Sequence, residues 1–385
     1  MEFNVNKNCN VLTISLSGKL DAMSAPALEE SISKQLSSVS EVIFDVKDLE
    51  YISSAGLRVV LKAKHTVDNT KVINANAEVF DIFEMTGFSE MMSVSKKYRE
   101  LSVDGCEIIG KGYCGTVYRL SKDTIVKVYQ PKMTLEDINR ERDLARKAFV
   151  LGIPTAIPYD VVKVGENFGS VFELLEAETL QKRILNDMDH LDDYIAQYIK
   201  VLKTIHANQV KPGELYNKKA TMLEYALSIK GQLDQRIGDK LVELINNIKD
   251  DNHLIHGDYH IKNIMIQNGE PFIIDMDTLS MGSPIFELGF MYSCYQAYQE
   301  IDRANGKEFF GIDQDVLDYI YKKSMDIYFE GKPKEYIEEI IKKARILSYT
   351  QLLDRFIKNN DHPEEIKLFK KEITELIDEV KDLNI

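Results

Sequence analysis

The sequence predicts two domains, an α/β domain followed by a larger α+β domain of two lobes. The chain has 385 residues, which is too long for one compact core. Strand and helix patterns alternate up to Phe88, as in an α/β fold. A glycine-rich loop and a strand hairpin follow, and helical periodicity prevails after Thr179. Together these three observations predict the two-domain α/β plus α+β architecture.

The first domain is predicted from strands and helices that alternate along the chain. Leu12, Ile14 and Leu16 alternate with polar neighbours, which is the period of a half-covered strand. Ser24 can cap the next helix, whose apolar residues recur every four positions as far as Leu36. The later predicted elements are a strand over 42–46, a helix that includes Val60 and Leu61, a strand over 71–76 and a helix over 79–88.

Composition narrows the class of partner. The net charge is −14, and the sequence lacks the clustered Lys and Arg that bind polyanions, so we expect no nucleic-acid partner. The same charge permits a cationic substrate without requiring one. No apolar run is long enough to span a bilayer, and the first residues lack the pattern of a secretory signal. We therefore expect no membrane association, a cytoplasmic location and four reduced cysteines.

The segment from Asp48 to Leu57 reads DLEYISSAGL. It resembles the phosphorylation site of STAS domains, the family of anti-sigma-factor antagonists, in which a modified serine lies in a loop before a helix. The resemblance implies that Ser54 is the phosphosite and that the domain binds a protein partner. Ser53 stands where many relatives have Asp. Both hydroxyls could instead serve only as helix caps, and the sequence leaves the two interpretations open.

A glycine-rich loop opens the second domain, with Gly110, Gly112 and Gly115 in the spacing G-x-G-x-x-G. In a dinucleotide-binding fold this spacing would open a helix, whereas here it leads into a strand, a turn and a strand over 124–129. This order is typical of the hairpin that covers the nucleotide in kinases. Lys127 lies in the second strand between apolar neighbours and would reach the α- and β-phosphates.

A charged helix and an apolar strand complete the predicted nucleotide site. The helix spans 134–150, and of its acidic residues we choose Glu141 as the partner of Lys127. A strand and hinge over 171–176 would bring backbone groups of Glu173 and Leu175 to the adenine. The predicted ranges are 1–99 for the first domain and 100–385 for the second, with a nucleotide-binding lobe over 100–176 and a mainly helical lobe over 177–385.

The most specific pattern in the chain reads HGDYHIKN over 256–263, followed by IIDMD over 273–277. Asp258, Asn263 and Asp275 supply an acid, an amide and a second acid after an apolar strand. These are the oxygen-bearing groups that orient a hydroxyl and hold Mg²⁺ against nucleotide phosphates. The pattern therefore indicates phosphoryl transfer.

Two histidines in this pattern allow an alternative. His256, Asp258 and His260 could form a transition-metal site if their side chains pointed the same way, but this would leave Asn263 and Asp275 unexplained. We therefore interpret His256 as a support of the loop. His260 is a candidate contact to substrate or phosphate.

Together, the glycine loop, the strand lysine and the HGDYHIKN motif resemble the aminoglycoside phosphotransferase and choline kinase family, whose two-lobed fold is related to that of protein kinases. The resemblance implies that Asp258 orients the substrate hydroxyl and accepts its proton, with ATP as the donor. It also implies that Asn263 and Asp275 hold Mg²⁺ and that Asp277 lines the pocket. Glu287 departs from the family pattern, which more often has Asp there. A loose phosphoryl transition state is stabilised by such positioning and charge neutralisation.

Three functions remain to be weighed. The first is a small-molecule O-phosphotransferase, and the second is a signalling protein serine kinase. Protein kinases carry a long activation segment that closes with Ala-Pro-Glu, whereas here only residues 276–284 separate Asp275 from a predicted helix over 285–298. The third is an inactive partner-switching adaptor, which the intact motif residues oppose. The sequence therefore favours a small hydroxylated acceptor but does not distinguish among an aminoglycoside, choline, ethanolamine, a sugar and a homoserine-like amino alcohol.

Overall fold

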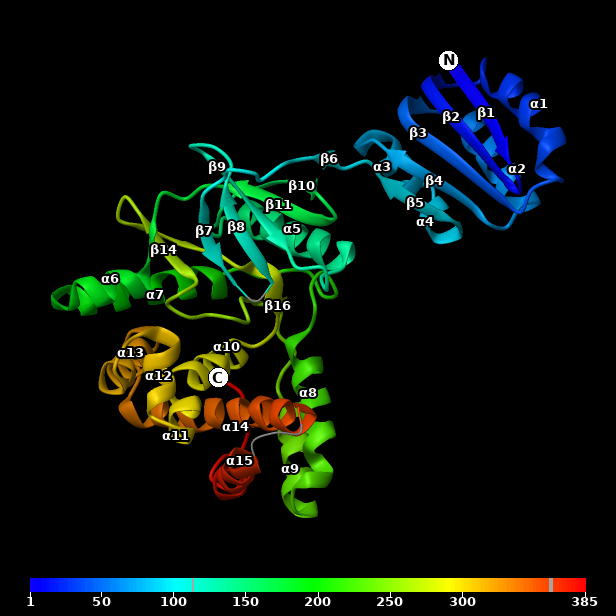
Figure 1. Ribbon diagram of the computed structural model, residues 1–385. Coiled ribbons are helices and arrows are strands. Elements are labelled where there is room, and N and C mark those ends of the chain that lie inside the picture. The colour runs from blue at the N-terminus through cyan, green and yellow to red at the C-terminus, as the bar shows by residue number, and fades with distance from the viewer. Residues whose placement is uncertain (113, 360–362) are drawn as a thin grey trace. The chain divides into compact units, whose positions relative to one another are not determined.

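The computed structural model describes residues 1–112, 114–359 and 363–385 (Figure 1). These residues form two compact units, Met1–Ser102 and Val103–Ile385. The division falls slightly later than the predicted boundary after residue 99. Tyr113, in the predicted glycine loop, lies outside the described residues.

Within residues 1–102 the chain forms an α/β domain on a five-stranded sheet of order β1-β2-β3-β4-β5. Strands β2 to β5 run parallel, and β1 pairs antiparallel with β2 at the edge. The strands are β1 (Glu2–Asn8), β2 (Val11–Leu20), β3 (Glu41–Ile52), β4 (Thr70–Ala75) and β5 (Ser93–Lys96), and β6 (Arg99–Glu100) follows. The helices are α1 (Ala25–Leu36), α2 (Ser54–Thr66), α3 (Ala77–Met85) and α4 (Phe88–Met91).

The core of this domain follows the predicted alternation. Leu12, Ile14 and Leu16 of β2 are buried, and the apolar stripe of α1 packs in the same cluster. Strand β3 is longer than the predicted strand over 42–46, because its pairing with β2 continues to Ile52. Strand β1 was not predicted, since its polar side chains suit an edge position that is largely exposed.

The second unit begins with the predicted hairpin. Strands β7 (Ile108–Lys111), β8 (Gly115–Arg119) and β9 (Thr124–Tyr129) pair antiparallel, and the sheet continues through β11 (Asn167–Glu173) to β10 (Pro158–Val164). Helix α5 (Leu135–Val150) packs on β10 and β11. Thr134 and Asp137 close a reciprocal capping box at the start of α5. This sheet and helix form the smaller lobe.

The larger lobe is mainly helical, as predicted. Its helices are α6 (Leu180–Asn186), α7 (Leu191–His206), α8 (Lys218–Ile229), α9 (Gln235–Asn246), α10 (Ile285–Tyr292), α11 (Tyr298–Ile301), α12 (Ala304–Phe310), α13 (Gln314–Tyr328), α14 (Lys334–Asn359) and α15 (Pro363–Leu376). Helix α14 packs against α8, α10 and α15 (Figure 1). The predicted helix over 285–298 is interrupted, because a π-helical turn over Ser293–Ala297 separates α10 from α11. No helix in the described ranges is long and apolar enough to cross a membrane.

Short strands in the larger lobe position the predicted catalytic segments. Strand β13 (Leu254–Ile255) pairs with β16 (Ser280–Met281), and β14 (Ile264–Gln267) pairs with β12 (Glu178–Thr179) and β15 (Glu270–Ile273). The HGDYHIKN segment therefore spans the interval between β13 and β14. The Ile273 nitrogen also donates to the Pro154 carbonyl of the smaller lobe at 2.7 Å, which fixes the end of β15 beside that lobe.

Candidate active site

Glu287 braces the loop that carries Asp258. This carboxylate is fully buried in α10 and accepts hydrogen bonds from the backbone nitrogens of His256 at 2.6 Å and Gly257 at 3.0 Å. Gly257 has a φ of +87°, and a Cβ atom there would lie 2.8 Å from the Thr278 carbonyl oxygen, so a larger residue would not fit. The loop is thus held by one buried charge and one tight turn.

The charge on Glu287 is matched by its surroundings. Burial acts to raise the pKa of Glu287, but His206, His256 and the backbone N–H of Gly257 outweigh burial and lower it. The Nε2 atom of His206 lies 3.9 Å from the carboxylate, beyond hydrogen-bond distance, so its influence is electrostatic. Its Nδ1 atom lies 2.7 Å from the Tyr328 hydroxyl. His206 is therefore a buried structural residue, as predicted.

His256 supports the loop through both ring nitrogens. Its Nδ1 atom accepts from the backbone nitrogen of Asp258 at 3.2 Å, and its Nε2 atom lies 3.2 Å from the Ile274 carbonyl oxygen. An imidazole engaged in this way has no free nitrogen for a metal ion. The geometry thus favours the supporting role over the transition-metal alternative.

Asp258 and Asn263 lie together at the end of the loop. The Asn263 Nδ2 atom donates to the Oδ2 atom and to the carbonyl oxygen of Asp258, both at 2.9 Å. His260 approaches from the other carboxylate oxygen, with its Nε2 atom 3.5 Å from Oδ1. Burial lowers the pKa of His260, although the charge of Asp258 opposes this shift. The imidazole is therefore neutral near pH 7.

Lys127 joins the two lobes at the site. Its Nζ atom lies 2.7 Å from Glu141 Oε1 and 3.1 Å from Asp275 Oδ1. The predicted pairing with Glu141 is thus confirmed. Burial acts to lower the pKa of Lys127, but the charges of Asp275 and Glu141 outweigh it and raise the pKa above its ordinary value. Lys127 therefore carries a fixed positive charge in the cleft between the lobes.

Carboxylates converge beside this lysine. Burial first, and then the charges of Asp275 and Glu141, raise the pKa of Asp277 to about 7. Beyond the effect of burial, the part of this shift that comes from Asp275 and Glu141 shows negative charge that Lys127 does not fully balance. The side-chain oxygens of Asn263 and Asp275 are ligands of the kind that Mg²⁺ prefers, and it binds few protein groups when phosphates share its coordination. The residues present therefore fit a divalent cation.

A cavity of about 490 Å³ gathers most of the predicted nucleotide residues. Gly115 lies so close to β9 that a Cβ atom would be 2.2 Å from the Val128 carbonyl oxygen, which requires glycine at this position. The predicted residues that line the cavity are Gly110, Gly112, Gly115, Lys127, Glu141, Asp258, Asp275 and Asp277. The sequence thus predicted residues that the fold brings to one cavity from both lobes.

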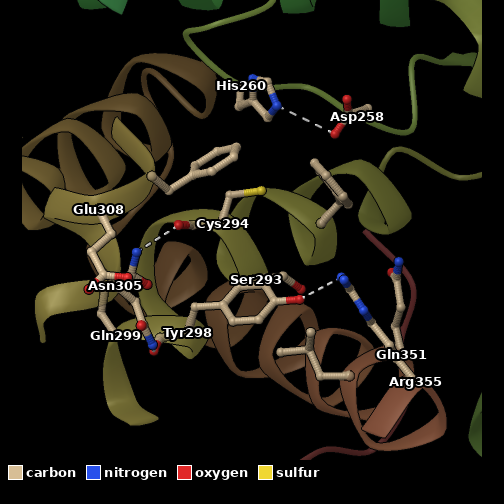
Figure 2. A pocket seen from close by; sticks show the side chains of 13 residues that line it. Asp258, His260, Ser293, Cys294, Tyr298, Gln299, Asn305, Glu308, Gln351 and Arg355 are labelled. Atoms are coloured by element: carbon tan, nitrogen blue, oxygen red, sulfur yellow. Dashed lines mark hydrogen bonds and ion pairs between the residues drawn. The ribbon is translucent and has the colours of Figure 1, made fainter. Parts of the chain in front are cut away.

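Asp258 also lines a second cavity, of about 560 Å³, in the helical lobe (Figure 2). His260 lies beside Asp258 there, as Figure 2 shows, while Tyr298 and Arg355 lie farther along the wall. The other lining residues are Phe290, Ser293, Cys294, Gln299, Asn305, Glu308, Phe309, Gln351 and Leu352. These were not predicted. They come from α10 to α12 and α14, and no local motif marks them.

Two predicted hinge residues and Asn263 do not line the nucleotide cavity. The carboxylate of Glu173 accepts from the Ile157 nitrogen at 3.2 Å, and the Leu175 carbonyl accepts from the Ala177 nitrogen at 2.9 Å. The side-chain amide of Asn263 instead donates a hydrogen bond to the Asp258 carboxylate. Contacts of Glu173 and Leu175 with adenine therefore stay predictions.

In the first domain, Ser53 and Ser54 differ in role. Ser53 is the N-cap of α2, and its hydroxyl accepts from the Gly56 nitrogen at 3.4 Å. Ser54 is the first helical residue, and it is exposed. Within the described residues the Ser54 hydroxyl makes no hydrogen bond, so capping accounts for Ser53 but not for Ser54.

The fold and the site together define a kinase-like phosphotransferase with a STAS domain at its N-terminal end. Residues 105–318 match the model of the phosphotransferase enzyme family, and residues 2–101 match the model of the STAS domain. The first match spans more than half of the chain. The chain therefore belongs to the phosphotransferase enzyme family.

Individual relatives are distant. The anti-sigma-B factor antagonist of Bacillus subtilis strain 168 is 26% identical over 97 residues, which cover 24% of this chain and 89% of that protein. An apo thermostable mutant of an aminoglycoside phosphotransferase is 12% identical, with a TM-score of 0.49 over 71% of this chain and 94% of that one. An ADP-bound aminoglycoside phosphotransferase is 17% identical, with a TM-score of 0.48 over 77% of this chain and 96% of that one.

Proposed function

We propose that this protein is an ATP- and Mg²⁺-dependent phosphotransferase that acts on a hydroxyl group of a small molecule. The observation that carries the proposal is that Asp258 lines two cavities. One of them also contains Lys127 and Asp275, and the other is enclosed by the helical lobe. A carboxylate in this position can orient an acceptor in the second cavity towards a nucleotide in the first.

Each residue of the site has a proposed part in the transfer. Asp258 accepts the proton of the acceptor hydroxyl as its oxygen bonds to the γ-phosphorus and the bond to the β-phosphate oxygen breaks. Lys127, oriented by Glu141, neutralises the α- and β-phosphates. Asn263 and Asp275 would hold Mg²⁺, which would neutralise the charge that develops on the phosphates.

The remaining predicted residues shape the two pockets. Backbone groups of the loop with Gly110, Gly112 and Gly115 surround the phosphates, and those of Glu173 and Leu175 meet the adenine. Asp277 lies in the nucleotide cavity beside Asp275, and His260 lies in the acceptor cavity beside Asp258. Both therefore act on charge and hydrogen bonding at the point of transfer.

The test of this proposal is Asp258→Asn in the full chain. We expect the rate of phosphoryl transfer from labelled ATP to a panel of alcohols to fall by about two decades or more, because the group that orients the hydroxyl is lost. Binding of a fluorescent nucleotide should survive. Asp275→Asn should instead weaken the Mg²⁺ dependence of that binding. Turnover near wild type in Asp258→Asn would refute the proposal.

We further propose that the STAS domain is a regulatory or docking module that acts through Ser54. The hydroxyl of Ser54 is exposed at the N-terminus of α2, where backbone N–H groups and the helix dipole would stabilise a phosphate. Phosphorylation by another kinase would add close to two negative charges to the surface that a protein partner meets.

A further inference from the structure

We infer that the acceptor is a neutral or zwitterionic small molecule with several hydroxyl or other hydrogen-bond donor groups, and that it is not a polyamine. The inference rests on the proposed function, since it assigns the cavity of Figure 2 to the acceptor. It is carried by the charges on the cavity wall and by two buried acceptor atoms that lack a partner.

The charges on the wall nearly balance. Among the described residues that line the cavity, Asp258 and Glu308 are acidic and Arg355 is basic. Asp258 faces the hydroxyl that reacts, which leaves one charge of each sign for the rest of the acceptor. A molecule with several ammonium groups would lose hydration on entry without enough carboxylates to replace it. A neutral or zwitterionic molecule would not incur this penalty.

Gln299 has a buried acceptor atom in the wall of the cavity. Its side chain is 6% exposed, and its Nε2 atom donates to the Cys294 carbonyl oxygen at 2.9 Å. Because a carbonyl oxygen only accepts, this bond fixes the orientation of the amide. The Oε1 atom has no partner among the described residues. A buried oxygen of this kind favours a ligand that donates a hydrogen bond to it.

His260 presents a second acceptor atom. Its Nε2 atom faces the Asp258 carboxylate at 3.5 Å, so this geometry assigns the ring proton to Nε2 and leaves Nδ1 as the acceptor. The buried Nδ1 atom has no partner within the described ranges. A donor group near the reacting hydroxyl of the acceptor would satisfy this atom.

Aromatic side chains form another part of the wall. Tyr298 is held by Arg355, whose Nη1 atom donates to its hydroxyl at 2.8 Å, and Phe309 lines the same cavity. The π-helical turn over Ser293–Ala297 brings Ser293 and Cys294 to the wall, and such turns occur frequently at functional sites. These surfaces suit the carbon skeleton of a polyol, while Gln299 and His260 receive its donors.

The first experiment compares acceptors of different charge. The full chain is assayed with ATP and Mg²⁺ against methyl glucoside, homoserine and kanamycin, which are neutral, zwitterionic and polycationic. We expect kcat/KM for the best neutral or zwitterionic compound to exceed that for kanamycin by about tenfold or more. A higher kcat/KM for kanamycin than for methyl glucoside and homoserine would overturn the inference. So would the absence of both turnover and thermal-shift binding with methyl glucoside and with homoserine.

The second experiment tests Gln299 itself. Gln299→Met keeps the size of the side chain but removes the acceptor oxygen, so KM for the acceptor should rise by about tenfold. Gln314→Met is the matched control, because Gln314 is also buried, donates to the Tyr295 carbonyl and has an unpartnered Oε1 atom, yet does not line the cavity. Equal KM values in the two variants, at similar Tm, would count against the inference.

Asp258→Asn separates this inference from the proposed function. If kanamycin is the preferred acceptor and Asp258→Asn abolishes its phosphorylation, the inference fails while the proposed function stands. If Asp258→Asn leaves every transfer rate unchanged, the proposed function fails, and the assignment of the cavity fails with it.

Discussion

Glu287 is a single residue on which the geometry of the catalytic loop depends. We expect Glu287→Gln to lower Tm and to reduce turnover by about tenfold or more, because an amide nitrogen would face a backbone N–H and remove a charged acceptor. Glu287→Asp retains the charge but is shorter, so its effect should be smaller. Thermal unfolding and acceptor turnover of both variants check this expectation. Equal losses of Tm and turnover in the two variants would show that the length of the side chain, and not its charge, holds the catalytic loop in place.

Glu287 should also affect how the stability of the protein depends on pH. The pKa of Glu287 is lowered from its ordinary value of 4.5, so its contribution to stability is present above that value and is lost as the pH falls below it. The Tm difference between wild type and Glu287→Gln should therefore stay the same from pH 7 to about pH 5 and narrow as the pH falls below 4.5. A Tm difference that does not narrow below pH 4.5 would contradict the assignment.

At the residue scale, the sequence predicted best where residues form local motifs. Glu141 was chosen for its position on the helix before the Gly152-Ile153-Pro154 break, and it is the residue with which Lys127 pairs in the structure. Gln299 and Arg355 could not be found in this way, because they reach one cavity from different helices and follow no fixed spacing. Their positions in the cavity depend on how the helices pack, and this packing is set by the whole core and not by any local pattern in the sequence.

At the scale of elements, α5 positions Glu141 and depends on its cap. Thr134→Ala removes half of the capping box and should lower the free energy of unfolding by about 1 kcal/mol. The affinity for nucleotide should fall as well, because the first turns of α5 lead to Glu141. Thr374→Ala is the control, since this exposed threonine lies inside α15 and bonds only to the Lys370 carbonyl. Denaturant unfolding would refute the expectation if both variants lost the same stability.

Element boundaries show where periodicity is informative and where it is not. Helix α1 begins after Ser24, the predicted cap, although the Ser24 side chain makes no capping hydrogen bond to the helix, and α5 begins directly after Thr134, where the predicted helix started. The predicted helix over 285–298 contains a π-helical turn, because one extra residue in a turn leaves the pattern of apolar residues almost unchanged. Strand β1 was missed since its alternation is limited to Phe3 and Val5, and the rest of this edge strand is polar. Irregular and edge elements are therefore hard to predict from pattern alone.

At the scale of the whole molecule, two compact units were predictable because each begins with its own pattern, alternating strands and helices in one and a glycine loop with a hairpin in the other. We expect mass spectrometry of protein from its native cells to find phosphate on Ser54. Ser54→Asp should then change partner binding or acceptor turnover relative to Ser54→Ala.

Ser53→Ala is the matched control for this prediction. It removes the cap of α2, so it should lower the stability of the first domain by about 1 kcal/mol while leaving Ser54 available for modification. Phosphate on Ser53 instead of Ser54, or identical behaviour of Ser54→Ala and Ser54→Asp, would reduce the domain to a passive docking module.

The two cavities that meet at Asp258 have a consequence for inhibitor design. A compound that links a nucleoside phosphate to an acceptor-like polyol would occupy both, and once one half is bound, the other half binds as an intramolecular step at high effective concentration. Such a bisubstrate ligand should bind more tightly than either half alone. The spacer between the two halves would have to pass the Asp258 carboxylate. The spacer length that gives the tightest binding would therefore report the distance over which phosphate is transferred.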